Sequence, residues 1–167
     1  MSCGRRARCI VAIAMAVTAV AVMAALRLAP AARFRSGASA DLAAGNGTCV
    51  IGRCTTELNP DQRSRNDNIA IAAEKLDGTM VGPGQEFSFN EAVGERSSEL
   101  GYGPARVIRD GRSEPGIAGG ICQLSSTLYN AALLAGMEIT ERRPHSRPVP
   151  YLPAGLDATV SYGAADL

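Results

Sequence analysis

The fold of this chain is decided by the stretch from Gly119 to Asp157, which reads GGICQLSSTLYNAALLAGMEITERRPHSRPVPYLPAGLD. After the two glycines, apolar residues recur at helical spacing. This spacing predicts a helix from Cys122 to Ala135, and Gly136 is the expected C-terminal stop. The inward-facing side chains of this helix are expected to be Leu124, Leu128, Ala131, Ala132 and Ala135.

Shorter elements are predicted on both sides of this helix. Residues Asn66–Leu76 show helical spacing and begin at a capping residue, Asn66 or Asp67. Alternation and turn residues predict strands at Phe87–Phe89, at Ala105–Arg109 with a hairpin around Asp110-Gly111, at Met137–Arg142 and at Ala158–Tyr162. This order predicts an α+β fold, one small domain in which the helix that opens at Cys122 packs on an antiparallel sheet.

The start of the predicted helix carries a thiol, Cys122, directly after Gly119 and Gly120. A thiol there lies at the positive end of the helix dipole and beside unpaired backbone N–H groups, and both favour the nucleophilic thiolate. We interpret Gly119, Gly120 and Gln123 as substrate-binding and oxyanion residues, because the glycines let a substrate approach the backbone. The alternatives are a small buried core residue for Cys122 and an exposed first-turn position for Gln123.

The only histidine of the chain, His145, follows Cys122 by 23 residues, and Asp157 comes 12 residues later. If the strand after Gly136 runs back along the helix, His145 reaches the helix start and Asp157 orients its ring. The candidate catalytic residues are therefore Cys122, His145 and Asp157. Their order, with the thiol opening a helix, resembles the arrangement in transglutaminase-like and papain-like enzymes. The competing interpretations are a solvated loop histidine and an aspartate that only caps a turn.

The N-terminal part has the pattern of a membrane segment. Cys9 to Leu26 is a run of 18 uncharged residues, about 27 Å of helix, and three arginines precede it as positive-inside orientation requires. We interpret residues 1–35 as an uncleaved, single-pass signal-anchor in a cell membrane; a cleaved signal peptide is the alternative. Residues 36–48 are predicted to be a flexible linker to a domain of residues 49–167 outside the cytoplasm.

The charge of the chain is distributed unevenly. Residues 1–35 hold six of the 17 basic residues and none of the 16 acidic ones, so residues 36–167 carry a net charge of −5. A mildly acidic domain lacks the basic surface that a nucleic-acid partner requires. The sequence contains no Walker or Rossmann glycine pattern, and we expect no cofactor.

Two of the five cysteines, Cys49 and Cys54, frame a short loop, TCVIGRC. In an oxidising exterior this pair is predicted to form a small disulfide; unpaired thiols are the alternative. We expect no metal site, because structural metal sites use four thiolate or imidazole ligands and the chain has a single histidine. Cys122 is then the odd thiol outside the cell.

The stretch from Gly119 to Tyr162 closely resembles the core of the VanW-like family of bacterial envelope proteins. Upstream, Arg65-Asn66 with Asn68-Ile69, then PGQEFSFN at Pro83–Asn90, fit the same family in the same order. The resemblance covers roughly residues 54–167. The family pattern continues beyond the end of this sequence, so the domain is expected to be truncated at its C-terminus.

The family is named for accessory genes of glycopeptide (vancomycin) resistance clusters, so the resemblance implies a role in the cell envelope. Two hypotheses follow from the residues and from the predicted export. The first is a thiol-dependent hydrolase or transferase that acts on peptidoglycan amide bonds. The second is a non-catalytic cell-wall-binding or accessory module in which the GGICQ region forms a recognition groove. In both, the expected partners are the membrane and peptidoglycan or another envelope component.

Overall fold

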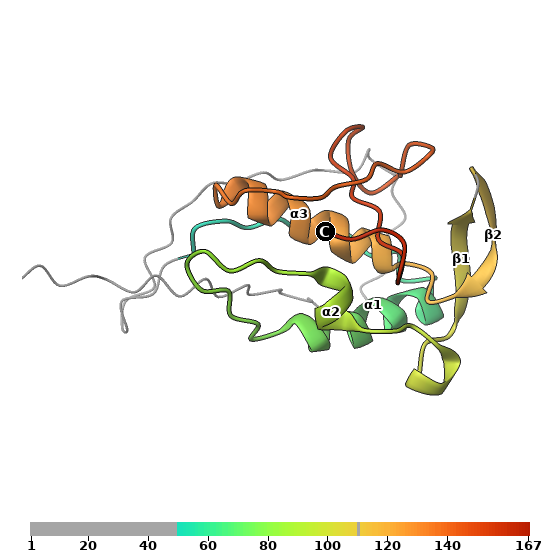
Figure 1. Ribbon diagram of the computed structural model, residues 1–167. Coiled ribbons are helices and arrows are strands. Elements are labelled where there is room, and N and C mark those ends of the chain that lie inside the picture. The colour runs from blue at the N-terminus through green and yellow to red at the C-terminus, as the bar shows by residue number, and fades with distance from the viewer. Residues whose placement is uncertain (1–49, 110) are drawn as a thin grey trace, which may run out of the picture.

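The computed structural model describes residues 50–109 and 111–167 (Figure 1). This part of the chain is a small α+β domain with a two-stranded antiparallel sheet. Its elements, in chain order, are α1 (Arg63–Leu76), α2 (Phe89–Val93), the 3-10 helix η1 (Ser98–Leu100), β1 (Pro104–Arg109), β2 (Arg112–Ile117) and α3 (Ile121–Leu134).

The predicted hairpin is confirmed. Strands β1 and β2 pair antiparallel, with Ala105 opposite Gly116 and Arg109 opposite Arg112. Gly111 has a φ of 73°, the left-handed conformation that a tight hairpin turn requires. Figure 1 shows the hairpin projecting beyond the ends at which α1 and α3 begin.

The decisive helix is also confirmed, because α3 covers Ile121–Leu134 and Gly136 follows it with a φ of 72°. Of the predicted inner stripe, Leu124 and Leu128 are buried, whereas the three alanines are half-buried. The helix that precedes it begins earlier than predicted. Helix α1 starts at Arg63 after Gln62, which makes no side-chain cap, and Asn66 instead lies inside the helix and donates from Nδ2 to the carbonyl oxygen of Asn59 at 2.8 Å.

The other predicted strands are wrong. Ser88 caps α2, because its Oγ accepts from the amide of Glu91 at 3.0 Å, so Phe89 begins a helix rather than ending a strand. The segments 137–142 and 158–162 form no ladder. The amide of Thr159 donates to the carbonyl of Arg143, just after the first segment, at 2.7 Å, and the second segment has only an isolated bridge from Ser161 to Ala165.

The reason for the missing ladder is that side chains of α3 take up the backbone groups of the C-terminal segment. The amide of Ala158 donates to Ser126 Oγ at 2.9 Å, and its carbonyl accepts from Ser125 Oγ at 2.7 Å. Helix α3 therefore packs on α1 and on an extended segment rather than on a sheet. The transglutaminase-like or papain-like architecture is not confirmed.

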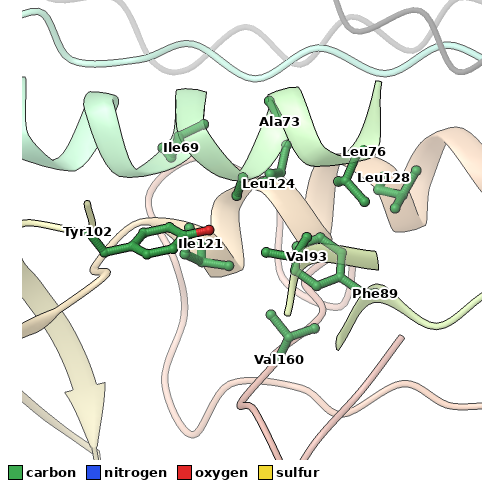
Figure 2. Close-up of a cluster of buried hydrophobic side chains, with 11 residues drawn as sticks. Ile69, Ala73, Leu76, Phe89, Val93, Tyr102, Ile121, Leu124, Leu128 and Val160 are labelled. Carbon is green, nitrogen blue, oxygen red and sulfur yellow. The ribbon is translucent and has the colours of Figure 1, made fainter. Parts of the chain in front are cut away.

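The core lies where α1, α2, α3 and the C-terminal segment meet (Figure 2). It is made mainly of aliphatic side chains, with Phe89 and Tyr102 as its aromatic members, 0% and 2% exposed. Each large apolar side chain buried in this way contributes roughly 1.5–3 kcal/mol to stability. The buried cluster comprises Ile69, Ala72, Ala73, Leu76, Phe89, Val93, Tyr102, Ile121, Leu124, Leu128 and Val160.

The predicted signal-anchor, residues 1–35, and the linker, residues 36–48, lie outside the described residues. Within residues 50–109 and 111–167, no helix is long and apolar enough to cross a bilayer.

A candidate Cys–His–Asp active site

Cys122 is the second residue of α3, and two glycines bring the start of this helix into close contact with the rest of the fold. A Cβ on Gly119 would lie 2.5 Å from the carbonyl oxygen of Arg106 in β1. Gly120 has a φ of 110°, and a Cβ there would lie 2.8 Å from Cγ of Arg65 in α1. The space beside both glycines is thus occupied by the protein's own elements, so their predicted substrate contact has a packing explanation and stays a prediction.

The thiol of Cys122 is half-buried and points to the C-terminal segment. Its Sγ donates to the carbonyl oxygen of Val160 at 3.5 Å, and its interaction with the His145 side chain is one of the causes that raise the pKa of His145. The amide of Gln123 donates to Gly120 O at 2.9 Å. Among the described residues, the amides of Ile121 and Cys122 have no such acceptor, so they are the backbone donors that an oxyanion beside the thiol would meet.

The structure brings His145 and Asp157 together. Nδ1 of His145 lies 2.7 Å from Oδ2 of Asp157, and the backbone amide of His145 donates to the same oxygen at 2.6 Å. With Nδ1 bonded to the carboxylate, Nε2 is the ring nitrogen left for the thiol. The His145 side chain is 5% exposed, so the interpretation of His145 as a solvated loop residue is wrong. In Figure 1 the segment after α3 runs back along the helix toward its start.

Asp157 is held in place from both sides. Nη2 of Arg142 lies 3.3 Å from Oδ1 of Asp157, and Nε of Arg142 donates to its backbone carbonyl at 2.8 Å. Asn130 of α3 donates from Nδ2 to the carbonyl of Leu156 at 2.6 Å, next to the bonds from Ser126 to Ala158. These bonds fix the carboxylate against the start of α3, which is more than the capping of a turn.

These interactions shift the pKa values of both partners. Burial by itself lowers the pKa of His145, but the interactions of its side chain with those of Cys122 and Asp157 outweigh it and raise that pKa above its usual value. Burial by itself raises the pKa of Asp157, but the hydrogen bonds from His145 outweigh it and lower that pKa. Both shifts favour an imidazolium beside a carboxylate.

The interior position of Gln123 corrects the prediction of an exposed first-turn residue. Gln123 is 3% exposed, and its Oε1 accepts from Nη2 of Arg65 at 2.6 Å. Its Nε2 donates to Thr56 Oγ1 at 3.0 Å and to the carbonyl of Glu57 at 2.9 Å. Both amide hydrogens therefore have protein acceptors, and neither is free for a substrate oxygen.

Sequence reasoning missed two residues at the site, Arg65 and Tyr151. Cζ of Arg65 lies 6.0 Å from the centre of the Tyr151 ring, and both residues lie within electrostatic reach of Cys122. Burial raises the pKa of the Tyr151 hydroxyl well above its usual range, so the phenol stays protonated and can donate. Nothing in the spacing of these residues signals the contact, because Arg65 lies in the first turn of α1 and Tyr151 lies 86 residues later, among prolines.

Cys49 lies outside the described residues, so the Cys49–Cys54 disulfide stays a prediction. Burial raises the pKa of the Cys54 thiol.

Because His145 is the only histidine of the chain, its ring protons give an unambiguous NMR titration. The pKa of His145 in the folded protein is expected above about 6.5, the value for an unperturbed imidazole. Asp157→Asn removes the carboxylate charge and Cys122→Ala removes the sulfur, so each variant is expected to lower this pKa. A wild-type value at or below that of a free imidazole, unmoved by either change, would contradict the geometry described above.

The same shifts predict how stability depends on pH. The raised pKa of His145 stabilises the fold fully below about pH 6.5 and ceases to do so as pH rises through the folded-state pKa. The lowered pKa of Asp157 stabilises the fold above about pH 4 and ceases to do so as pH falls through its folded-state pKa. The loss of unfolding free energy in Asp157→Asn, measured in urea, is therefore expected to peak at about pH 5–6. A loss of equal size at every pH would show that no ion pair contributes.

Fold and site together define a class of protein, a small α+β domain whose helix-opening thiol meets a histidine–aspartate pair. The chain belongs to the VanW-like family, because the family described as VanW like protein matches residues 64–167.

Two curated relatives support this membership. Uncharacterized protein YoaR of Bacillus subtilis is 44% identical over 126 residues, which are 75% of this chain and 42% of the relative. Vancomycin B-type resistance protein VanW of Enterococcus faecalis is 31% identical over 111 residues, 64% of this chain and 40% of the relative. The chain thus spans about two fifths of the length of the relatives it matches. No solved structure matches it significantly.

Proposed function

We propose that this chain is a thiol-dependent hydrolase or transferase that acts on amide bonds of peptidoglycan. The observation that carries the proposal is the contact of the Cys122 thiol with a histidine whose Nδ1 lies 2.7 Å from the Asp157 carboxylate. A thiol, a base and a group that orients the base are the set that nucleophilic acyl transfer requires.

In the proposed reaction, His145 takes the proton of the Cys122 thiol and the thiolate attacks the carbonyl carbon of the amide. The amides of Ile121 and Cys122, with the protonated Tyr151 hydroxyl nearby, are the donors for the oxyanion. The C–N bond then breaks, the amine leaves with the proton from His145, and a thioester remains on Cys122. Water or a second amine, deprotonated by His145, attacks this thioester and releases the thiol.

Asp157 is a positioning residue in this scheme. It keeps the proton on Nδ1 of His145, so that Nε2 faces the thiol, and its charge stabilises the imidazolium that forms. The proposed setting is the outer side of a bacterial membrane, supported by the apolar run from Cys9 to Leu26. The Enterococcus relative carries vancomycin resistance in its name, and we propose the same setting of antibiotic resistance for this chain.

The test is an incubation of the full-length chain with purified peptidoglycan fragments, followed by mass spectrometry. Hydrolysis adds one water to the products, and transfer exchanges one amine for another. Asp157→Asn is expected to slow either reaction by roughly 10²–10⁴-fold and to change its pH profile, because His145 loses its orienting partner. Fragments that bind with no change of mass, equally well to wild type and to Cys122→Ser, would overturn the proposal in favour of a non-catalytic wall-binding module.

A further inference from the structure

Arg96, two residues after Gly94, is a half-buried cation, and one edge of its guanidinium is buried without an acceptor among the described residues. Its guanidinium lies over the rings of Phe89 and Tyr162, with Cζ 5.4 Å and 5.9 Å from the two ring centres. Its Nε and Nη2 atoms are buried, and among the described residues neither has a hydrogen-bond partner. A buried guanidinium edge with no acceptor lowers the stability of the free protein, and its N–H groups can donate to a bound anion.

No carboxylate of the described residues pairs with this edge. Asp166 is within electrostatic reach of Arg96, but its two oxygens accept from Ser88 Oγ and from the amide of Asn90. The two aromatic faces attract the cation, yet they offer no lone pairs in the plane of the guanidinium. The in-plane fork of Nε and Nη2 matches the two oxygens of a carboxylate.

Arg96 also lies beside the proposed nucleophile. Cys122 Sγ donates to the carbonyl of Val160, two residues before Tyr162, whose ring lies under Arg96. Phe89, the other ring partner, belongs to the same core cluster as Val160 (Figure 2). Arg96 and Cys122 are accordingly within electrostatic reach of each other.

A groove gives access to this region. It has a volume of about 380 Å³, and its lining includes Tyr162 and Arg143 together with the acidic residues Glu91, Glu141 and Asp166. The carboxylate of Glu141 already pairs with Arg143, and that of Asp166 accepts from Ser88 and Asn90. Tyr162 is 55% exposed and lines the groove, and its ring is also one of the two that contact the guanidinium. The Tyr162 ring must turn aside, as the inference drawn below requires, so that a ligand in the groove reaches the Nε and Nη2 atoms of Arg96.

We propose that Arg96 binds a carboxylate of the substrate and thereby selects anionic peptides whose carboxylate lies close to the scissile amide. This inference rests on the proposed function, because it assigns the substrate class of the same site. It makes Arg96 a specificity-determining residue with no part in proton transfer.

The test compares two reagents that alkylate Cys122 with loss of iodide, the anionic iodoacetate and the neutral iodoacetamide. Rates are measured on the full-length chain by mass spectrometry of the peptide that contains Cys122. Arg96→Met keeps an apolar stem between the two rings and is expected to lower the iodoacetate-to-iodoacetamide rate ratio roughly tenfold. Arg96→Lys keeps the charge and is expected to retain most of the ratio, and Arg112→Met, at an exposed arginine of β2, to leave it unchanged.

A ratio that is the same in wild type, Arg96→Met and Arg96→Lys overturns the inference and leaves the proposed function standing. A thiol that reacts with neither reagent overturns the proposed function instead. Arg96 is then tested in Cys122→Ser by the binding of one peptidoglycan stem peptide as its free acid and as its amide. Tighter binding of the acid by roughly tenfold, lost in Arg96→Met, supports the inference; equal binding of acid and amide, or no binding of either, overturns it.

Discussion

Replacement of Cys122 by alanine is expected to lower the rate of amide cleavage or transfer by at least about a thousandfold. The variant lacks the sulfur that contacts His145, so no acyl-enzyme can form. The fold is expected to survive, with a change in unfolding free energy of about 1 kcal/mol or less, because the half-buried thiol makes one weak backbone bond, to Val160. The measurement is the initial rate of product formation from peptidoglycan fragments.

The matched control is Cys54→Ala, which removes the other half-buried thiol among the described residues. It is expected to retain full activity. Cys122→Ser is expected to be as inactive as Cys122→Ala, since a hydroxyl is a far weaker nucleophile than a thiol in the same position. Cleavage by Cys122→Ala at the wild-type rate would exclude Cys122 as the nucleophile.

The largest effect on stability is expected from Gly120→Ala. The new methyl group would lie 2.8 Å from Cγ and 3.1 Å from the carbonyl oxygen of Arg65, and 3.2 Å from Cδ1 of Ile69, at a φ of 110° that an L side chain rarely adopts. Strain and overpacking together are expected to lower the free energy of unfolding by roughly 3 kcal/mol or more. Urea unfolding followed by circular dichroism measures this loss.

Gly78→Ala separates the two causes of this loss. Gly78 also has a positive φ, 73°, but nothing lies within 4 Å of the position of its missing Cβ. This variant carries the backbone strain alone and is expected to lose about 1 kcal/mol. Equal losses in the two variants would show that the start of α3 does not pack tightly on α1.

Local patterns were enough to predict the elements whose cause is local. Helix α3 follows from the spacing of Leu124 and Leu128 and from its stop at Gly136, and the hairpin follows from its Asp-Gly turn. The strands at 137–142 and 158–162 were wrong because alternation indicates only that one face is buried. It does not indicate that the hydroxyls of Ser125 and Ser126 will bind the backbone that a neighbouring strand would otherwise have paired.

Part of the candidate site was accessible to sequence reasoning because it depends on element order. A segment that follows a helix through a tight turn runs back along it, which places His145 near Cys122 and Asp157 near His145. Arg65 and Tyr151 were missed as parts of the site, since their positions depend on contacts between segments far apart in the chain. The sequence did contain one signal that another segment would pack on the polar side of α3. Asn130 follows Ser126 by four residues, and polar side chains on the buried side of a helix need hydrogen-bond partners.

The central claim is that His145 acts on the Cys122 thiol, and the rate of Cys122 alkylation by iodoacetamide at neutral pH tests it most directly. Wild type and His145→Ala are compared as full-length chains, with Arg147→Ala, an exposed neighbour, as the control. We expect His145→Ala to react at least about tenfold more slowly, because the thiol loses the base that accepts its proton, and Arg147→Ala to react like wild type. Equal rates in wild type and His145→Ala would contradict the account and leave Cys122 a structural residue.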